Sequence, residues 1–254
     1  MGPAQAQLTC DRFLGGRLKI WQPAGGYRAG ADAVLLAAAV RARPQDEVLE
    51  LGCGAGVASL CLAWRVGLKN PAAVELQEEY AELARRNARA NGIGLQVSTA
   101  DLAALPASLR GRSFDHVLAN PPYFLPARSS PAPDPGRALA RSGATPLAVW
   151  VDVATRRLRP GGSLTMIQHV ERLDELLRAL DSRLGSIAIL PLAARAGREA
   201  RRVILSARKG GRGRLRLLAP LILHAGAGHG ADGDDYTPEV SAILRRGAPL
   251  NFPD

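Results

Sequence analysis

Asn120-Pro121-Pro122-Tyr123 contains the residue types best suited to chemistry in this chain of 254 residues. It directly follows Phe114 to Ala119, an apolar-alternating run short enough to be one buried strand. Two consecutive prolines cannot extend a sheet, because neither has an N–H group and both fix φ near about −65°. The strand must therefore end at Asn120, which places this side chain at the carboxyl edge of an open α/β sheet, where ligands bind.

Such an arrangement is suited to methylation of an amine attached to a planar group, whose lone pair is delocalised into the ring. The Asn120 side-chain oxygen and the Pro121 carbonyl could accept both amine hydrogens and turn the lone pair toward an electrophilic methyl group. No general base is required, because the proton can leave after transfer. Tyr123 would stack on the planar group, which is worth about 1–3 kcal/mol for a nucleobase. A strand that merely ends in a rigid turn is the alternative, since Asn-Pro is a common turn starter.

Upstream, Val48 to Leu51 has the pattern of a short buried strand and Ser59 to Val66 that of a helix. The loop between them contains three glycines, at Gly52, Gly54 and Gly56. Strand, glycine loop and helix are the start of a doubly wound nucleotide-type fold, in which the backbone passes close to a ligand. The spacing departs from the dinucleotide fingerprint, and Glu50 before the first glycine favours a cationic or zwitterionic ligand.

The next two strand ends both carry acids. Glu75 lies near the end of the expected strand Ala72 to Leu76, at the distance from the glycines where an acid binds ribose hydroxyls. Asp101 follows the expected strand Leu95 to Ser98, placed to accept a hydrogen bond from an adenine amine. A solvated acid is the alternative for each. The four strand ends should converge on one crevice, because successive parallel strands present their carboxyl ends at the same edge.

The remaining segments supply the scaffold. Asp11 to Gln22 predicts a hairpin about Gly15-Gly16, and Ala33 to Val40 a helix with Asp32 near its start, where it could also act only as a cap. Leu125 to Gly143 lacks periodicity and is interpreted as a mobile loop over the crevice, with Arg128, Arg137 and Arg141 either meeting phosphate or solvated. Further expected elements are helices at Glu78–Asn91, Thr145–Leu158, Leu173–Leu184 and Pro238–Arg246, a turn at Arg159–Gly162, strands at Ser163–Gln168, Ile187–Leu192 and Arg202–Ala207, an edge strand within Leu215–His224, and a glycine-rich loop at Ala225–Asp235.

A formal net charge of +10 favours a polyanionic partner. The basic segment after residue 194 is the best candidate for RNA binding outside the crevice, and a solvated hairpin is the alternative. The residues expected to contact RNA there are Arg201, Arg202, Arg208 and Lys209. No signal peptide or membrane span is expected, and three unpaired cysteines favour the cytosol. The four histidines lack metal-ligand spacing, so no metal site is expected.

Glu50-Leu-Gly-Cys-Gly-Ala-Gly56, Glu75, Asp101 and Asn120-Pro-Pro-Tyr123 together resemble the class I S-adenosylmethionine-dependent methyltransferases that act on amines. Phe13-Leu14-Gly15-Gly16, Gln22-Pro23, Gly26-Tyr27-Arg28, Asp32-Ala-Val-Leu-Leu-Ala37 and Tyr236-Thr-Pro-Glu239 narrow the resemblance to bacterial tRNA (adenine-N6)-methyltransferases that modify the adenosine beside the anticodon of a valine tRNA. The resemblance is strong to about residue 123 and weaker in the arginine-rich C-terminal third.

The resemblance implies an α/β, Rossmann-like fold with a seven-stranded, mostly parallel sheet, one antiparallel strand and helices on both faces. It implies segments 1–44 (hairpin and helix closing the cofactor pocket), 45–210 (methyltransferase core) and 211–254 (an extension packed on the core). S-adenosylmethionine would be the cofactor and tRNA the partner, with monomer and homodimer both left open. The implied cofactor contacts are Tyr27, Arg28, Asp32, Glu50, Gly52, Gly54, Gly56, Glu75, Leu76, Asp101, Leu102 and Asn120, and the implied substrate contacts are Asn120, Pro121, Pro122 and Tyr123.

Other functions remain open at this point. The same tetrapeptide could hold a glutamine side chain of a release factor, although few residues precede the cofactor strand, or the guanine amine of an rRNA. An RNA-binding protein with a vestigial methyltransferase fold is a non-enzyme alternative, which the intact Glu50, Glu75 and Asn120 disfavour. An NAD-dependent dehydrogenase is disfavoured by the glycine spacing and by Pro-Pro after the fourth strand.

Overall fold

The computed structural model describes residues 7–123, 145–226 and 235–252, so the predicted loop 125–143 and most of the glycine-rich loop 225–235 lie outside the described residues. The strands are β1 (Leu8–Phe13), β2 (Leu18–Pro23), β3 (Val48–Leu51), β4 (Ala72–Glu75), β5 (Gln96–Thr99), β6 (Phe114–Ala119), β7 (Leu158–His169), β8 (Leu184–Ala193), β9 (Ala200–Lys209), β10 (Arg216–Leu217) and β11 (Leu221–Ile222). The helices are α1 (Ala31–Ala39), α2 (Val57–Val66), α3 (Glu78–Ala90), α4 (Ala107–Arg110), α6 (Leu147–Arg157), α7 (Leu173–Ala179) and α8 (Pro238–Arg246), with short 3-10 turns at Leu14–Gly16, Leu102–Ala104 and Val170–Arg172.

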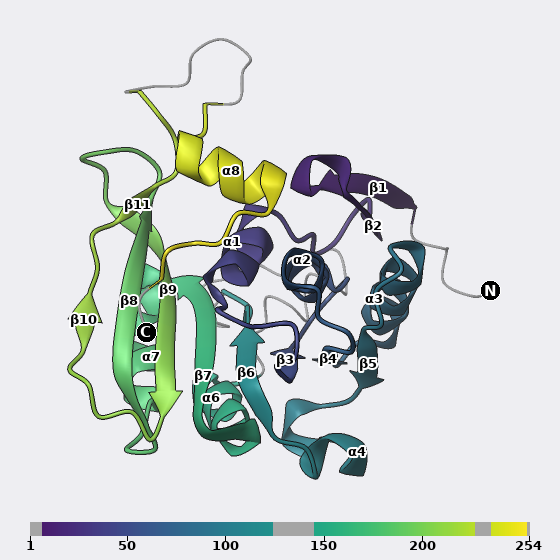
Figure 1. Cartoon of the computed structure of the whole chain (residues 1–254), viewed down its shortest axis with the longest axis horizontal. Coiled ribbons are helices and arrows are strands. Elements are labelled where there is room, and N and C mark those ends of the chain that lie inside the picture. Colours follow the sequence, from purple (N-terminus) through teal and green to yellow (C-terminus); the bar gives the residue numbers. More distant parts are fainter. Residues whose placement is uncertain (1–6, 124–144, 227–234, 253–254) are drawn as a thin grey trace.

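Within the described residues, one nine-stranded sheet forms the centre of the molecule (Figure 1). Seven of its strands follow the order β5-β4-β3-β6-β7-β9-β8. Pairings are parallel from β5 to β7, while β9 runs antiparallel to both β7 and β8. The two-residue strands β10 and β11 add to β8 in parallel. The predicted seven-stranded sheet with one antiparallel strand is confirmed, with two short additions at its edge.

The central strands are apolar on both sides because helices cover both faces of the sheet (Figure 1). Alternate residues of one strand enter different cores: Leu164 and Met166 of β7 pack with α6 and α7, whereas Ile167 packs with α1, α2 and α8. Parallel strands joined by helices bring the carboxyl ends of β3, β4, β5 and β6 to one edge. The polar residues that follow these strands therefore meet there.

The N-terminal hairpin β1–β2 is held against α3 by two asparagines one helical turn apart. Asn87 Oδ1 accepts from the backbone N–H of Trp21 at 2.8 Å, and its Nδ2 donates to the Trp21 carbonyl at 3.0 Å. Asn91 repeats both bonds with Lys19 at 3.0 and 2.8 Å. Because Asn87 is fully buried and also donates to the Ala55 carbonyl at 2.9 Å, it links the hairpin to the glycine loop. This link fixes where the chain enters the site at Tyr27.

The C-terminal helix α8 packs on α1 and on the turn Leu14–Gly16, so segments from near the start and near the end of the sequence lie side by side (Figure 1). Thr237 caps its start by accepting from Val240 N at 3.4 Å, and Pro238 occupies the first turn, where its missing N–H is not needed. Helix α8 therefore begins and ends where its sequence predicts.

Several predicted elements have different limits in the structure. The helix predicted to reach Leu184 ends at Ala179, because Asp181 accepts from the backbone N–H of Arg183 at 2.8 Å and forms a turn that starts β8 at Leu184. The turn predicted at Arg159–Gly162 is an irregular stretch inside β7, where the pairing with β6 shifts register. The predicted edge strand is split into β10 and β11, and Pro220 lies between them.

Candidate active site

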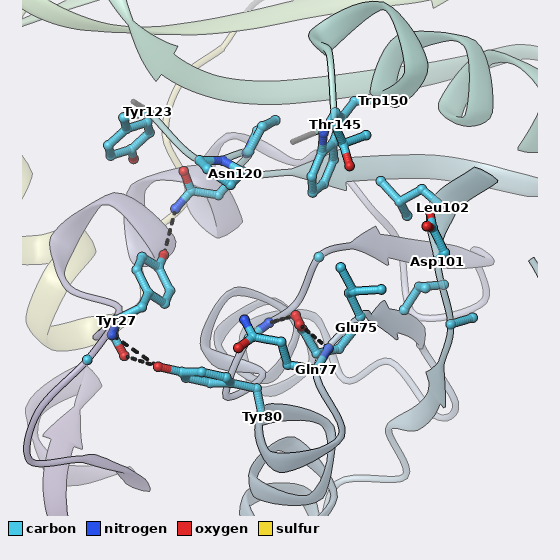
Figure 2. Close-up of a pocket in the computed structure, with 18 of the residues that line it drawn as sticks. Tyr27, Glu75, Gln77, Tyr80, Asp101, Leu102, Asn120, Tyr123, Thr145 and Trp150 are labelled. Carbon is cyan, nitrogen blue, oxygen red and sulfur yellow. Dashed lines mark hydrogen bonds between the residues drawn. The ribbon is translucent and has the colours of Figure 1, made fainter. Parts of the chain in front are cut away.

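A cavity of about 450 Å³ lies at the carboxyl ends of β3, β4, β5 and β6 (Figure 2). The residues predicted there that do line it are Tyr27, Arg28, Gly52, Gly54, Glu75, Leu76, Asp101, Leu102, Asn120, Pro121, Pro122 and Tyr123. Among the described residues, Asp32, Glu50 and Gly56 are predicted for the cofactor but do not line the cavity. The convergence of four strand ends on one crevice is thus present in the structure.

The glycine loop forms one wall, and two aromatic rings pack on it. Gly52 and Gly54 have φ of 66° and 54°, a region in which residues with a side chain are strained. A Cβ on Gly52 would lie 2.5 Å from the Trp150 ring, and a Cβ on Gly54 would lie 3.5 Å from the Tyr27 ring. Only glycine at position 52 lets α6 bring Trp150 this close to the backbone.

Tyr27 is fixed in turn by α3. The Tyr80 hydroxyl accepts from Tyr27 N–H and donates to the Tyr27 carbonyl, both at 3.0 Å (Figure 2). Burial raises the pKa of the Tyr27 hydroxyl, with the charges of Glu50 and Asp32 as smaller causes, so it remains a neutral donor. Tyr27 is thereby a rigid wall between the glycine loop and Asn120.

Glu75 presents a carboxylate that the backbone holds in place. One oxygen accepts from Gly54 N–H at 2.8 Å and the other from Gln77 N–H at 2.9 Å (Figure 2). Burial raises the pKa of this group, and the bonds from Gln77 and Gly54 oppose that rise. Each carboxylate oxygen can accept more than one hydrogen bond, so the group can still accept from hydroxyls of a ligand.

Beyond Glu75 the cavity offers a flat apolar slot with one acid at its rim. Leu76 is 52% exposed although it is a large apolar residue, and it lines the cavity together with the buried Leu102. Asp101 accepts from Ala103 N–H at 2.8 Å and thereby caps the short turn Leu102–Ala104. Its second oxygen has no such bond to Ala103, and an acid in this position can accept from an amine on a planar ring.

The Asn120 side chain places a buried acceptor in the site. Its Nδ2 lies 3.4 Å from the Tyr27 hydroxyl oxygen, whereas its Oδ1 is buried without a hydrogen-bond partner among the described residues (Figure 2). A buried polar atom without a partner costs about 1–3 kcal/mol, so it calls for an explanation. The two prolines that follow are fixed from outside the cavity, because their carbonyls accept from Gln168 Nε2 at 3.4 Å and Arg172 Nη1 at 2.6 Å. The site therefore contains a buried acceptor that has no donor among the described residues.

Three predicted cofactor residues have other partners. Glu50 is buried and turns toward α2, where it accepts from Ser59 N–H at 2.9 Å and Ser59 Oγ at 2.5 Å. Asp32 accepts from the Tyr123 hydroxyl at 2.9 Å and pairs with Arg202. The Arg28 guanidinium points to β1, where it pairs with Asp11 at 2.6 Å, although the residue itself lines the cavity.

The structure adds residues that the sequence did not single out. Trp150 of α6 covers Gly52 and has a buried Nε1 without a hydrogen-bond partner among the described residues. Tyr80, Gln77 and Thr145 also line the cavity. Trp150 lies in an apolar helical pattern that also fits a simple core position. Trp150 can be recognised as a site residue only from its contact with Gly52, which lies 98 positions earlier in the sequence. The sequence pattern does not contain that information.

The residues predicted to contact RNA are separated by the structure. Arg201 and Arg202 lie at the start of β9, beside the carboxyl end of β7, with Arg201 exposed. Arg208 and Lys209 lie at the opposite edge of the sheet, where Arg208 Nε donates to the Gly161 carbonyl at 2.9 Å and Lys209 Nζ to the carbonyls of Thr155 and Leu158 at 2.7 Å. Arg128, Arg137 and Arg141 lie outside the described residues.

Comparison with known proteins assigns the family. The methyltransferase small domain family matches residues 28–132. The tRNA1(Val) (adenine(37)-N6)-methyltransferase of Aeromonas hydrophila is 32% identical over 190 residues, which cover 72% of this chain and 77% of that protein. The Porphyromonas gingivalis protein of the same name is 32% identical over 199 residues with the same coverage. The chain belongs to the family of these tRNA1(Val) (adenine(37)-N6)-methyltransferases.

Solved structures agree with this methyltransferase assignment. A protein described as a predicted O-methyltransferase from Agrobacterium tumefaciens has a TM-score of 0.69 at 28% identity and covers 86% of this chain and 98% of its own. The Thermus thermophilus 16S rRNA N2 G1207 methyltransferase, solved with S-adenosylmethionine and guanosine, has a TM-score of 0.56 at 22% identity, covers 82% and 51%, and supports the fold alone. The protein is a class I S-adenosylmethionine-dependent methyltransferase.

The residues present fit this cofactor. The backbone at Gly52 and Gly54 leaves no side chain between the cavity and the sheet, Glu75 offers a fixed carboxylate, and Leu76 and Leu102 offer apolar surface for a planar ring. In this order, these groups suit the methionine, ribose and adenine parts of S-adenosylmethionine.

Glu50 predicts a pH dependence of the methyltransferase's stability. Burial raises its pKa from 4.5 to about 8, against the lowering effect of Ser59. A carboxyl whose pKa is raised by folding contributes stability below its unfolded pKa and loses it as pH rises through the folded value. Relative to Glu50→Gln, the wild type should therefore lose on the order of 3 kcal/mol of unfolding free energy between about pH 5 and about pH 8.

Urea unfolding of both proteins at the two pH values measures this difference. Glu47→Gln is the matched control, because Glu47 lies just before the same strand but is only partly buried and pairs with Arg112. A constant difference between wild type and Glu50→Gln across this range would show that Glu50 is ionised in the folded protein.

Proposed function

We propose that this methyltransferase methylates the exocyclic N6 amine of an adenine in tRNA, at the position beside the anticodon. Relatives at 32% identity over most of the chain are named tRNA1(Val) (adenine(37)-N6)-methyltransferases, which supports this substrate. The observation that carries the proposal is the buried Asn120 Oδ1, which has no hydrogen-bond partner among the described residues; the next residue, Pro121, also lines the cavity, and its carbonyl accepts one hydrogen bond, from Gln168 Nε2 at 3.4 Å. Two fixed acceptors suit an amine with two hydrogens, whereas a hydroxyl has only one to donate.

S-adenosylmethionine supplies an electrophilic methyl group on a sulfonium. Asn120 Oδ1 and the Pro121 carbonyl accept the two amine hydrogens and hold the nitrogen lone pair toward the methyl carbon. As the N–C bond forms, the C–S bond breaks and S-adenosylhomocysteine leaves, and the extra proton on nitrogen then passes to solvent. The protein contributes mainly position, because the two acceptors are already in place before the substrate enters.

In this proposal Glu75 binds the ribose hydroxyls of the cofactor and Asp101 accepts from its adenine amine. Leu76 and Leu102 contact its adenine ring, and the backbone of Gly52 and Gly54 passes beside its methionine part. Tyr27 and Trp150 close the cavity over the loop. Glu75 and Asp101 keep acceptors available for this, since their known partners are backbone N–H groups.

The target base would leave its loop and enter the cavity, which single-stranded RNA permits at small cost. Tyr123 would stack on it. We place the enzyme in the cytoplasm with its tRNA substrate. No helix among the described residues has the length and apolar composition needed to cross a membrane.

The test is transfer from labelled S-adenosylmethionine to bulk tRNA that lacks the modification, followed by nucleoside analysis. The expected product is N6-methyladenosine beside the anticodon of a valine tRNA. Cofactor binding without labelled tRNA would overturn the proposal. Labelled rRNA guanine or labelled release-factor glutamine in parallel reactions would then identify the acceptor.

The position of the basic residues predicts how RNA binding depends on salt. Arg201 is exposed at the edge of the sheet that holds the cavity, so Arg201→Ala should reduce the slope of log affinity against log salt by about one phosphate contact. Arg208→Ala is the matched control on the same strand, because Arg208 lies at the opposite edge. Equal slopes for wild type and Arg201→Ala would make Arg201 a solvated residue without an RNA contact.

A further inference from the structure

Tyr123 is held by residues from two distant parts of the chain. Its hydroxyl donates to Asp32 Oδ2 of α1 at 2.9 Å, 91 positions earlier. Asp32 Oδ1 in turn pairs with the Arg202 guanidinium of β9, 170 positions later. The Asp32 side chain is only 14% exposed, so a negative charge there needs a partner. Arg202 supplies that partner.

The ring of Tyr123 is fixed as well as its hydroxyl. The His169 ring, at the end of β7, lies on Tyr123 with centroids 4.4 Å apart and an interplanar angle of 30°. Tyr123 also lines the cavity, so a ligand there can contact it. Burial raises the pKa of the Tyr123 hydroxyl, with the charge of Asp32 as the next cause, and the hydroxyl therefore stays a donor to Asp32.

We propose that Asp32 and Arg202 are positioning residues that hold the Tyr123 ring as a fixed wall for the planar substrate base. This inference rests on the proposed function. It places Asp32 on the substrate side of the cavity, whereas the family resemblance implies a contact with the cofactor. The geometry favours the substrate side, because both carboxylate oxygens of Asp32 are engaged by Tyr123 and Arg202 and the residue does not line the cavity among the described residues.

The role has a physical basis in the entropy of binding. A tyrosine with a free hydroxyl can rotate or tilt, and a base that stacks on it must first order the ring. With the hydroxyl bonded and His169 behind the ring, that ordering is complete before the substrate enters. Loss of the Asp32 contact should therefore weaken RNA binding and leave the cofactor, which is held by Glu75 and the glycine loop, unaffected.

The experiment is a double-mutant cycle with Asp32→Ala and Tyr123→Phe, reading KM for tRNA, kcat and the Kd for S-adenosylmethionine. Each single variant should raise KM for tRNA about tenfold, because part of the stabilisation from stacking one base on Tyr123 is lost. The Kd for S-adenosylmethionine should stay within about twofold of the wild-type value. The double variant should be no worse than the poorer single variant, because both changes remove the same contact. Asp32→Asn, which keeps an oxygen that accepts from Tyr123, should restore part of the loss.

Asp115→Ala is the matched control, because Asp115 also pairs with an arginine, Arg159 at 2.6 Å, but at the opposite edge of the sheet. Additive losses in the cycle, or a cofactor Kd that rises as much as KM in Asp32→Ala, would overturn the positioning role. A KM for tRNA equal to that of the wild type in Asp32→Ala would also overturn the positioning role. Should Asp32→Ala fail to fold, the same comparison of KM and cofactor Kd is made with Asp32→Asn and Arg202→Lys. Absence of methylated tRNA with the wild-type enzyme would instead overturn the proposed function.

Discussion

Asn120→Ala should lower kcat by about 10²–10³-fold while the Kd for S-adenosylmethionine changes only a few-fold, since removal of one fixed hydrogen-bonding group at a reacting centre has an effect of this size. Among the described residues, the Asn120 Oδ1 has no hydrogen-bond partner, and the Asn120 Nδ2 lies 3.4 Å from the Tyr27 hydroxyl oxygen. The substitution therefore removes the contact to the amine. It leaves in place the groups expected to hold the cofactor, which are Glu75, the glycine loop and the apolar surface of Leu76 and Leu102.

Single-turnover transfer to tRNA and calorimetric binding of the cofactor measure the two quantities separately. Asn120→Asp is the informative second variant, because it keeps the shape and an acceptor oxygen but adds charge; it should retain more activity than Asn120→Ala. Losses of equal size in kcat and in cofactor affinity would remove Asn120 from the role of amine acceptor and make it part of the cofactor pocket.

Much of the fold and the location of the site follow from local sequence rules. Pro121 and Pro122 end β6 at a known residue, and the glycines after β3 mark a turn that only small residues allow. Once these strands are parallel, Glu75, Asp101 and Asn120 must lie at one edge. These predictions depend on chain direction and backbone chemistry, which a single sequence contains.

The direction of individual side chains could not be predicted in the same way. Glu50 and Glu75 both lie at strand ends, yet one turns to Ser59 and the other into the cavity. Arg201 and Arg208 share a strand, but seven residues of strand separate them by about 23 Å and so place them at opposite edges. The ion pair between Asp32 and Arg202 joins positions far apart in the sequence and is visible only in the folded chain.

Glu75→Gln should raise the Kd for S-adenosylmethionine by about 10–100-fold, because hydrogen bonds to a charged group contribute about 1.5–3 kcal/mol. Both carboxylate oxygens already accept from backbone N–H groups, of Gly54 at 2.8 Å and of Gln77 at 2.9 Å. A glutamine has one oxygen and one NH2 group, so one of these N–H groups must face another donor. The substitution thus loses an acceptor for the ribose and also disturbs the turn at Gly54.

Glu78→Gln is the matched control, since Glu78 lies three residues later at an exposed site paired with Arg85 at 2.9 Å, and its cofactor Kd should equal that of the wild type. At saturating cofactor, Glu75→Gln should recover kcat to within a few-fold, because Glu75 acts on the ribose and not on the reacting amine. A large loss of kcat with unchanged cofactor Kd would contradict this and place Glu75 next to the methyl group. The two variants together divide the cavity: Glu75 should control how much cofactor is bound, and Asn120 how fast the bound methyl group is transferred.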